Sequence, residues 1–179
     1  MLVNTVDRIS FSEFHAGLAE ELVIMWRRSF EEAVGITDPH PLEEQRAYLM
    51  NEVVPRNALR VAFLDGEVVG FAAASSVSLA QLYVHLRFQR IGIGKRLLEW
   101  AKGQSAGSLW LFTFARNARA CAFYERNGFQ AVARGFEAKW QLEDVRYEWS
   151  AAGQNAPDAC NEHSATYHAA SMNSQETRP

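Results

Sequence analysis

The sequence predicts an α/β fold whose strands are mostly antiparallel, and two observations support that prediction. Two apolar runs, Ala58–Leu64 and 67–73, are joined by Asp65-Gly66, a dipeptide that supplies the positive φ angles of a two-residue hairpin turn. Further along, an apolar run at 79–86 leads through a glycine-containing turn at 89–94 into an amphipathic helix. A hairpin followed by alternating strands and helices is typical of a sheet with helices on its faces.

The first third of the chain predicts one strand and two helices. Residues 2–9 alternate loosely between apolar and polar side chains, which indicates a strand. A helix is expected to follow and to run to about residue 34, because large apolar side chains recur at steps of three or four. The residues of this series are Phe11, Phe14, Leu18, Leu22 and Met25. Two prolines interrupt the pattern in 35–41, and 42–54 predicts a second helix that ends before Pro55.

The second half predicts two more helices, each placed between strands. In the helix after the glycine-containing turn, the residues expected to face the core are Ile93, Leu97, Leu98 and Ala101. The pattern then repeats with a strand at Ser108–Phe114 and a helix at 117–127 that ends at Gly128. Two final strands are expected at 129–136 and 144–149.

A change in composition predicts the domain organisation. Residues 151–179 contain no Leu, Ile, Val, Phe or Trp, so this segment has little apolar surface to bury. The chain of 179 residues has the length of one domain, at roughly 100–200 residues each. We therefore expect one domain at 1–150 and a polar C-terminal tail at 151–179.

Charge and hydropathy argue against several classes of protein. The 18 basic and 21 acidic side chains give a net charge of -3, which disfavours non-specific binding to nucleic acid. The longest nearly unbroken apolar stretch, 68–74, is far shorter than the ~18 residues of a membrane-spanning helix. The first residues lack the pattern of a signal peptide, so a cytoplasmic location is expected. Cys121 and Cys160 form no CxxC pair, so no zinc ribbon or redox motif is expected.

The turn at 89–94 has the features of an anion site. Glycine lets a ligand approach the backbone closely, and the free N–H groups at a helix N-terminus favour a phosphate. Two other phosphate-binding motifs do not match. A dinucleotide fingerprint needs a third glycine where Leu97 stands, and a Walker loop needs glycine where Gln89 stands. From these six residues alone, a simple turn is an alternative to a phosphate site.

Together with the segments Asn117-Ala-Arg-Ala120 and Phe123-Tyr-Glu-Arg-Asn-Gly-Phe129, this turn resembles the GNAT superfamily of N-acyltransferases. The resemblance covers residues 2–149. It implies a mixed, mostly antiparallel sheet of about seven strands with four helices, splayed between strands 4 and 5. It also implies acetyl-CoA as the acyl donor, with no metal.

The resemblance places the donor site on the fourth strand, the glycine-containing turn and the last helix. The fourth strand of the family bonds the pantetheine arm where it splays from the fifth, which corresponds to 82–84. The residues implied for cofactor binding are Leu82, Tyr83, Val84, Gln89, Arg90, Ile91, Gly92, Ile93, Gly94, Lys95, Asn117 and Tyr124. Family members often carry Gly-Arg where this chain has Arg90 and Ile91. The side-chain contact to phosphate is therefore expected to shift to Arg90 or to be lost, while the backbone cradle is kept.

Tyr124 is the catalytic residue that the resemblance implies, as the group that protonates or hydrogen-bonds the departing thiolate. Asn117 lies seven residues earlier, so the two side chains fall on one helix face. Each has a structural alternative, because Asn117 is also a good helix N-cap and Tyr124 fits a half-buried core position. Proton transfer from a phenol of pKa ~10 to a thiolate of pKa ~8.5 is uphill by roughly 2 kcal/mol, so a hydrogen bond can matter as much as complete transfer.

The sequence says less about the site of the acyl acceptor than about the site of the donor. We expect an amine pocket beneath the first two helices, beside the loop at 35–41. The candidates for its walls are Trp26, Phe30, Phe71, Trp110 and Trp140, and for each of them a place in the core is the favoured alternative. A protonated amine must lose a proton before it attacks a thioester, and Glu31, Glu32, His85 or a water chain are the candidate acceptors. For His85 a structural hydrogen bond is the alternative role.

The expected function is transfer of an acetyl or similar acyl group from acyl-CoA to an amine, by direct attack in a ternary complex. A small-molecule amine is favoured over a protein tail. A homodimer is expected, since proteins of this family commonly pair through C-terminal strands. A non-catalytic acyl-CoA sensor is the alternative, and a protein N-acetyltransferase or a toxin acting on charged transfer RNA is a second one.

Two further patterns carry no expected function. The string Gly103-Gln-Ser-Ala-Gly107 matches a nucleophile elbow, but a helix precedes it and a strand follows, the reverse of the order that exposes the serine. Cys160, His163 and His168 lie close together in the tail, yet no second ligand pair supports a metal site there.

Overall fold

The computed structural model describes residues 8–152, which form seven strands and four main helical segments. The strands are β1 (Ile9–Glu13), β2 (Ala58–Leu64), β3 (Glu67–Ala74), β4 (Leu79–Val84), β5 (Ser108–Phe114), β6 (Gln130–Glu137) and β7 (Leu142–Ser150). The helices are α1 (Ala19–Val34), α2 (Leu42–Tyr48), α3 (Val54–Arg56), α4 (Ile93–Gln104) and α5 (Ala118–Arg126). Short turns of other helix types lie at η2 (Ala16–Leu18), η3 (Leu49–Val53) and η4 (Leu86–Phe88). Because η3 joins α2 to α3 without a break, these three form one segment.

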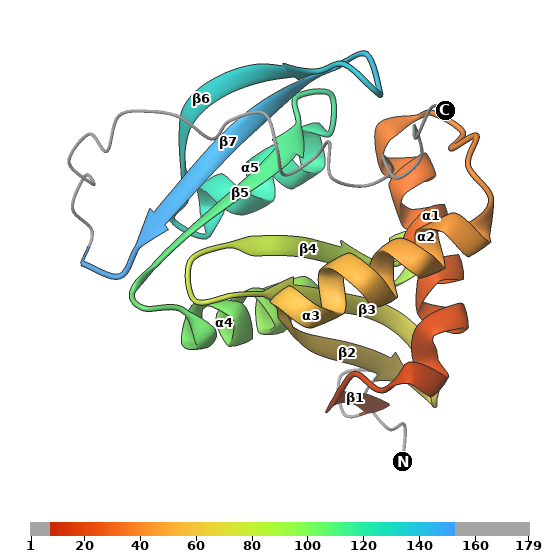
Figure 1. Cartoon of the computed structure of the whole chain (residues 1–179). Helices are drawn as coiled ribbons and strands as arrows, with labels where there is room; N and C mark the ends of the chain where they lie inside the picture. Colours follow the sequence, from red (N-terminus) through yellow and green to blue (C-terminus); the bar gives the residue numbers. More distant parts are fainter. Residues whose placement is uncertain (1–7, 153–179) are drawn as a thin grey trace, which may run out of the picture.

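The strands form two antiparallel sheets that touch at one short contact (Figure 1). The first sheet has the order β1-β2-β3-β4, and the second has the order β5-β7-β6. Within residues 8–152 a single parallel bridge, between Ser78 and Trp110, joins the sheets, and β4 and β5 diverge beyond it. The predicted α/β fold, with a mostly antiparallel sheet splayed between strands 4 and 5, is confirmed.

The predicted hairpin forms as β2 and β3. Asp65 and Gly66 have φ angles of 52° and 90° and connect Leu64 to its partner Glu67. Both angles lie in the left-handed region that a type I′ turn requires. On β3, a Cβ at Gly70 would lie 2.9 Å from the Tyr83 carbonyl oxygen, so glycine is needed for β3 to pair closely with β4.

Helices cover both faces of the first sheet, and each face buries its own apolar cluster. On the face beneath α1 and α2, Leu22, Leu49 and Phe71 are completely buried. On the face beneath α4, Leu97 and Leu98 are completely buried, and this cluster continues into the second sheet and α5. The four residues predicted to face the core from α4 are all buried, as expected.

The predicted start of the first helix was wrong, because α1 begins at Ala19 rather than near Phe11. The strand predicted at 2–9 lies mostly outside the described residues, and the first described strand is β1. Phe11 lies on β1 and pairs with Ala62 of β2. Apolar side chains at every second position of a strand, followed directly by a helix, produce a spacing that mimics one longer helix.

The second helix continues past Pro55, although it was expected to end before it. A π-helical turn, η3, precedes the proline, and Val54 N–H donates to the Leu49 carbonyl five residues back. A π turn is wider than an α turn and so accommodates a residue that clashes with regular winding and has no N–H to donate. Asn57 then closes the helix, since its Nδ2 donates to the Val53 carbonyl at 2.8 Å.

The remaining predicted elements differ from the observed ones by no more than two residues at either end.

The polar tail predicted at 151–179 lies almost wholly outside the described residues, and so do Cys160, His163 and His168. In the described part of the chain, none of the helices has the length and apolar character needed to cross a membrane.

We expect Leu98→Ala to lower the free energy of unfolding by about 2–5 kcal/mol, because it leaves a cavity at a completely buried position of α4. The matched control is Leu42→Ala at the start of α2, where the side chain is 44% exposed and the loss should stay within about 0.5 kcal/mol. Urea unfolding of both variants measures the difference. Equal losses would contradict the packing of α4 described above.

Candidate active site between the two sheets

The divergence of β4 and β5 opens a cavity of about 840 Å³ between the sheets. Its walls come from β4, the turn at 89–94, the first turn of α4, β5 and α5. Ten of the twelve residues predicted for the cofactor site line it, namely Leu82, Tyr83, Val84, Gln89, Arg90, Gly92, Gly94, Lys95, Asn117 and Tyr124. The volume lies in the range of roughly 300–1,000 Å³ that is usual for cofactor sites.

Ile91 and Ile93 are the two predicted residues whose side chains do not line the cavity. Ile93 is buried in the core beneath α4, and Ile91 packs against the same cluster. The start of an amphipathic helix turns its apolar side chains inward, so these two residues can offer only backbone N–H groups to a ligand.

The two glycines of the turn differ in how far their backbone conformation requires glycine. Gly92 is the N-cap of α4 and has a φ of 94°, in the left-handed region that strains other residues. Gly94 lies inside the helix, where a Cβ would be 3.6 Å from Phe123 Cζ, an ordinary contact. Arg90 also has a positive φ, 67°, so the turn holds a non-glycine residue in a strained conformation.

The charged side chains that line this cavity within residues 8–152 are all basic. Arg90 lies in the turn, Lys95 in the first turn of α4, and Arg119 and Arg126 on α5. The N-terminal end of α4 adds the positive end of the helix dipole. The cavity is therefore complementary to a ligand that carries several negative charges.

One edge of β4 faces the cavity, while the other pairs with β3. A strand edge that faces a cavity offers backbone N–H and C=O groups to an extended ligand. At the end of the strand, Gln89 Nε2 donates to the Val84 carbonyl at 3.1 Å. Gln89 therefore fixes the turn against β4, a role that the sequence did not predict.

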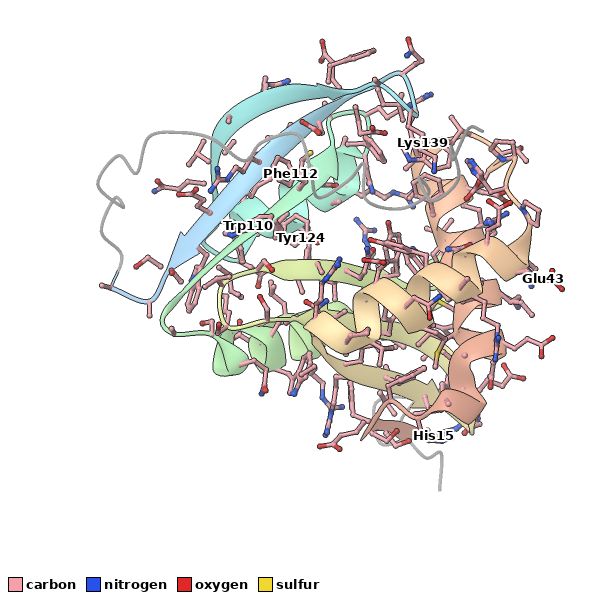
Figure 2. All side chains as sticks on the ribbon, viewed as in Figure 1. His15, Glu43, Trp110, Phe112, Tyr124 and Lys139 are labelled. Atoms are coloured by element: carbon pink, nitrogen blue, oxygen red, sulfur yellow. The ribbon has the colours of Figure 1, made fainter. Side chains whose placement is uncertain are left out.

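Tyr124 lies on α5 between the two sheets and lines the cavity (Figure 2). It is 7% exposed, and burial raises its pKa above the usual value of 10, with smaller contributions from Tyr83 and Cys121. No protein group in the described part of the chain hydrogen-bonds to its hydroxyl. The phenol therefore stays protonated at neutral pH and has a donor available for a ligand.

Asn117 has the capping role that was left open as an alternative. Its Oδ1 accepts a hydrogen bond from Ala120 N at 3.1 Å at the start of α5. The residue also lines the cavity, on the same helix as Tyr124. Its side-chain oxygen is thus already engaged by the protein.

A second pocket of about 90 Å³ lies between α1, α2, β4 and the turn that joins β6 to β7. Its aromatic walls are Trp26, Phe30, Tyr48, Tyr83, Phe114 and Trp140. Gln81 and Tyr83 of β4 line both this pocket and the large cavity. The two spaces therefore meet at β4.

Of the five residues predicted for the walls of an amine pocket, Trp26, Phe30 and Trp140 line this pocket, and Phe71 and Trp110 do not. Phe71 is completely buried beneath Trp26, with ring centroids 5.4 Å apart. Trp110 lies on β5, where the Arg146 guanidinium is 5.6 Å from its ring, and Figure 2 places it far from Lys139 at the pocket rim. Pattern alone could not separate aromatic residues of the pocket from those of the core or of the other sheet.

Two polar residues of the small pocket, Asp38 and His40, were missed by the sequence analysis. His40 Nδ1 lies 2.7 Å from Asp38 Oδ1, and Arg27 Nε lies 3.3 Å from Asp38 Oδ2. The available signal was an acid and a histidine flanking Pro39 in a short loop between two helices. Their contact with Arg27 of α1 depends on tertiary packing, which the loop sequence does not reveal.

The three predicted proton acceptors line neither space. The Glu31 carboxylate accepts the Asp38 backbone N–H at 2.9 Å, and Glu32 is exposed. His85 Nδ1 accepts the Arg87 N–H at 3.2 Å at the start of η4, and its ring packs on Phe88. For His85 the structure shows the hydrogen bond that was the alternative to catalysis.

The string at 103–107 that matches a nucleophile elbow lies at the end of α4. Ser105 follows the end of α4, and its Oγ donates to the Lys102 carbonyl at 2.7 Å. Across residues 8–152, no three His, Cys, Asp or Glu side chains are grouped so that they could hold a metal ion.

We expect Gly92→Ala to lower the free energy of unfolding by about 1 kcal/mol or more, because alanine is strained at a φ of 94°. Gly94→Ala is the matched control, two residues away in a helical conformation with room for a Cβ, and it should be neutral or slightly stabilising. Urea unfolding without any ligand checks both. A destabilised Gly94→Ala beside an unaffected Gly92→Ala would refute this description of the turn.

Comparisons with known proteins agree with this geometry. Residues 19–129 match the model of the acetyltransferase (GNAT) family. YncA of Salmonella typhimurium, solved with its cofactor acetyl-CoA, is 16% identical with a TM-score of 0.63, over 86% of this chain and 99% of that one. The PaiA N-acetyltransferase of Thermoplasma acidophilum, in complex with coenzyme A, is 22% identical with a TM-score of 0.64, over 79% and 98%. A GNAT-family acetyltransferase of Staphylococcus aureus is 19% identical with a TM-score of 0.66, over 80% and 99%.

The structural matches share the fold, and the family match covers more than half of the chain, from α1 to the residue before β6. It includes β4, the glycine-containing turn and Tyr124, which together form the large cavity. The chain therefore belongs to the GNAT family of acetyltransferases.

Proposed function

We propose that this protein transfers an acetyl group from acetyl-CoA to a primary amine of a small molecule, by direct attack in a ternary complex. One observation carries the proposal. A large cavity lined by basic side chains and a small aromatic pocket meet at β4, where they share Gln81 and Tyr83. Two substrates bound in these spaces would have their reacting groups side by side, as direct transfer requires.

The donor fits the large cavity by charge and by shape. Coenzyme A carries several phosphate charges, which the N-terminal end of α4 and the side chains of Arg90, Lys95, Arg119 and Arg126 would neutralise. The open edge of β4 at 82–84 offers backbone hydrogen bonds to the extended pantetheine arm. Relatives of the same fold bind acetyl-CoA or coenzyme A, which supports this assignment.

The acceptor fits the small pocket. A space of about 90 Å³ admits an amine on a slender group and excludes a bulky side chain, which favours a small molecule over a folded protein surface. Aromatic faces attract a cation, so an ammonium group enters such a pocket more readily than a neutral one of the same size. Trp26 and Trp140, from α1 and the β6–β7 turn, supply the largest of these faces.

Tyr124 acts at the leaving group in this proposal. Its hydroxyl stays protonated because burial raises its pKa, and it would donate a hydrogen bond to the sulfur as negative charge develops there. Complete proton transfer to the sulfur becomes less favourable as the pKa of the phenol rises. Stabilisation through the hydrogen bond is therefore the larger part of its role.

A homodimer, a cytoplasmic location and a division into a domain at 1–150 and a tail at 151–179 stay predictions from the sequence.

Acetyl-CoA should raise the melting temperature of the wild-type protein, with about 2.7 kcal/mol of added stability at a hundredfold excess over Kd. Gly94→Leu should abolish the rise, because its side chain would enter the cavity beside the first turn of α4. Gly103→Leu is the matched control on the same helix, outside the cavity and in open space, and should keep the full rise. An undiminished rise in folded Gly94→Leu would place the phosphates elsewhere.

Thiol release from acetyl-, propionyl- and succinyl-CoA across a panel of primary amines tests the reaction itself. Tyr124→Phe should lower kcat by about 100-fold or more while changing the Kd of acetyl-CoA little, because only the hydroxyl is lost. Tyr147→Phe is the control, since it removes the hydroxyl of another buried tyrosine, bonded to Glu125 and outside the cavity. Tight binding of acetyl-CoA without turnover of any amine would favour a sensor instead.

A further inference from the structure

We propose that His40, oriented by Asp38, accepts the proton that the amine must lose before it attacks. The inference rests on the proposed function, because it assigns the proton acceptor of that reaction. His40 lines the small pocket, whereas Glu31, Glu32 and His85 line neither the pocket nor the cavity.

The contact between Asp38 and His40 leaves the outer ring nitrogen as the proton acceptor. Asp38 Oδ1 lies 2.7 Å from His40 Nδ1 and also accepts the His40 backbone N–H at 3.0 Å. An ionised carboxylate can only accept hydrogen bonds, so the ring proton lies on Nδ1. Nε2 then carries the free lone pair, and no protein group in the described residues hydrogen-bonds to it. A carboxylate that fixes the histidine tautomer in this way is the arrangement of a general base.

The loop that carries Asp38 and His40 is held firmly to α1 and α2. The Arg27 Nη1 group donates to the His40 carbonyl at 2.8 Å, and Arg27 Nε donates to Gln45 Oε1 at 2.8 Å. Glu31 accepts the Asp38 N–H on the same side. The His40 ring packs edge-on against Trp140, with centroids 5.8 Å apart. Asp38 and Trp140 contact the His40 ring, while Arg27 and Glu31 hold its loop, so the ring keeps the geometry that proton transfer needs.

The phenols, amides and carboxylate that line the pocket are poorer acceptors than His40. Burial raises the pKa of Tyr83 to about 12 and also raises the pKa of Tyr48, so both phenols are protonated at neutral pH. Gln45 and Gln81 do not titrate, and Asp38 is already paired with Arg27 and His40. Among these groups, His40 is therefore the best proton acceptor, as its contact with Asp38 also indicates.

Charged groups of both signs surround the loop that carries His40. Asp38 on that loop and Glu31 on α1 are acidic, while Arg27 on α1 and Lys139 on the β6–β7 turn are basic. From α2 and β4 the facing titratable groups are the neutral phenols of Tyr48 and Tyr83. Glu43 and Glu44, in the first turn of α2, are exposed, and Glu43 points away from the molecule (Figure 2).

The proton balance of the step is complete. The ammonium loses one proton to Nε2, and the freed lone pair forms the bond to the acyl carbon. The carbon–sulfur bond then breaks, and its electron pair leaves on the sulfur, beside the Tyr124 hydroxyl. The second proton of the nitrogen passes to the thiolate, which gives the amide and free coenzyme A. His40 returns the first proton to solvent, and no other reactant is needed.

The decisive experiment is the pH profile of kcat/KM in three histidine variants, with an alkylamine that the wild type turns over. His40→Asn should lower kcat/KM by about 100-fold or more and remove the fall in rate at low pH, because the group that must be neutral to accept a proton is gone. His15→Asn is the control, since His15 lies at the far end of the molecule from Lys139 at the pocket rim (Figure 2). His85→Asn tests the competing histidine. An unchanged profile in His40→Asn, or the same loss in His85→Asn alone, would overturn the inference.

A second comparison separates proton acceptance from packing. An O-alkylhydroxylamine is already neutral at the assay pH, so its turnover should lose less than about tenfold in His40→Asn. Asp38→Asn should act like His40→Asn on the alkylamine, since an amide donor to Nδ1 moves the ring proton to Nε2, and the double variant should lose no more than either single one. An equal loss with both amines would show a packing role and refute the inference. A wild type that turns over no amine would instead overturn the proposed function, and this inference with it.

Discussion

The short contact between the two sheets is the constraint on which the rest of the structure depends. Trp110 N donates to the Val77 carbonyl at 3.1 Å, and Ser78 forms the parallel bridge to Trp110. The turn before β4 is stiffened by Ser75, whose N–H donates to the Ser78 carbonyl at 2.9 Å. Strands paired along their whole length lie only about 4.8 Å apart, which leaves no space for a ligand. Holding β4 and β5 together at one end and letting them diverge at the other creates the cavity without dividing the fold.

This divergence makes β4 the shared wall of two chemically different spaces. On the donor side, the glycine-containing turn and α4 supply backbone N–H groups and basic side chains, which suit phosphates. On the side proposed for the acceptor, aromatic rings packed beneath α1 and α2 line a pocket of about 90 Å³, and aromatic faces attract a cation. Gln81 and Tyr83 belong to both spaces, so a change at either residue is expected to affect both substrates.

Sequence reasoning succeeded where local patterns determine the structure. Asp65-Gly66 predicted the hairpin because only a few dipeptides adopt its φ angles, and the apolar face of α4 followed from its spacing alone. It failed where one spacing of apolar residues fits both a helix and a strand. Phe11 has a spacing that fits a helix, although it lies on β1. It also failed where partners are distant in sequence, because only packing brings Arg27 to the loop that carries Asp38 and His40.

Tyr124 and His40 illustrate how environment can separate an acid from a base within one site. Tyr124 is buried, and no group within residues 8–152 hydrogen-bonds to its hydroxyl, so the charged form is disfavoured and the group remains a donor. His40 Nδ1 lies 2.7 Å from Asp38 Oδ1, which leaves Nε2 as the ring nitrogen that can receive a proton. A donor is useful where negative charge develops on sulfur, and an acceptor is useful where an ammonium must become an amine. Residues of β4 line both spaces, the cavity that contains Tyr124 and is proposed for coenzyme A, and the pocket that contains His40 and is proposed for the amine.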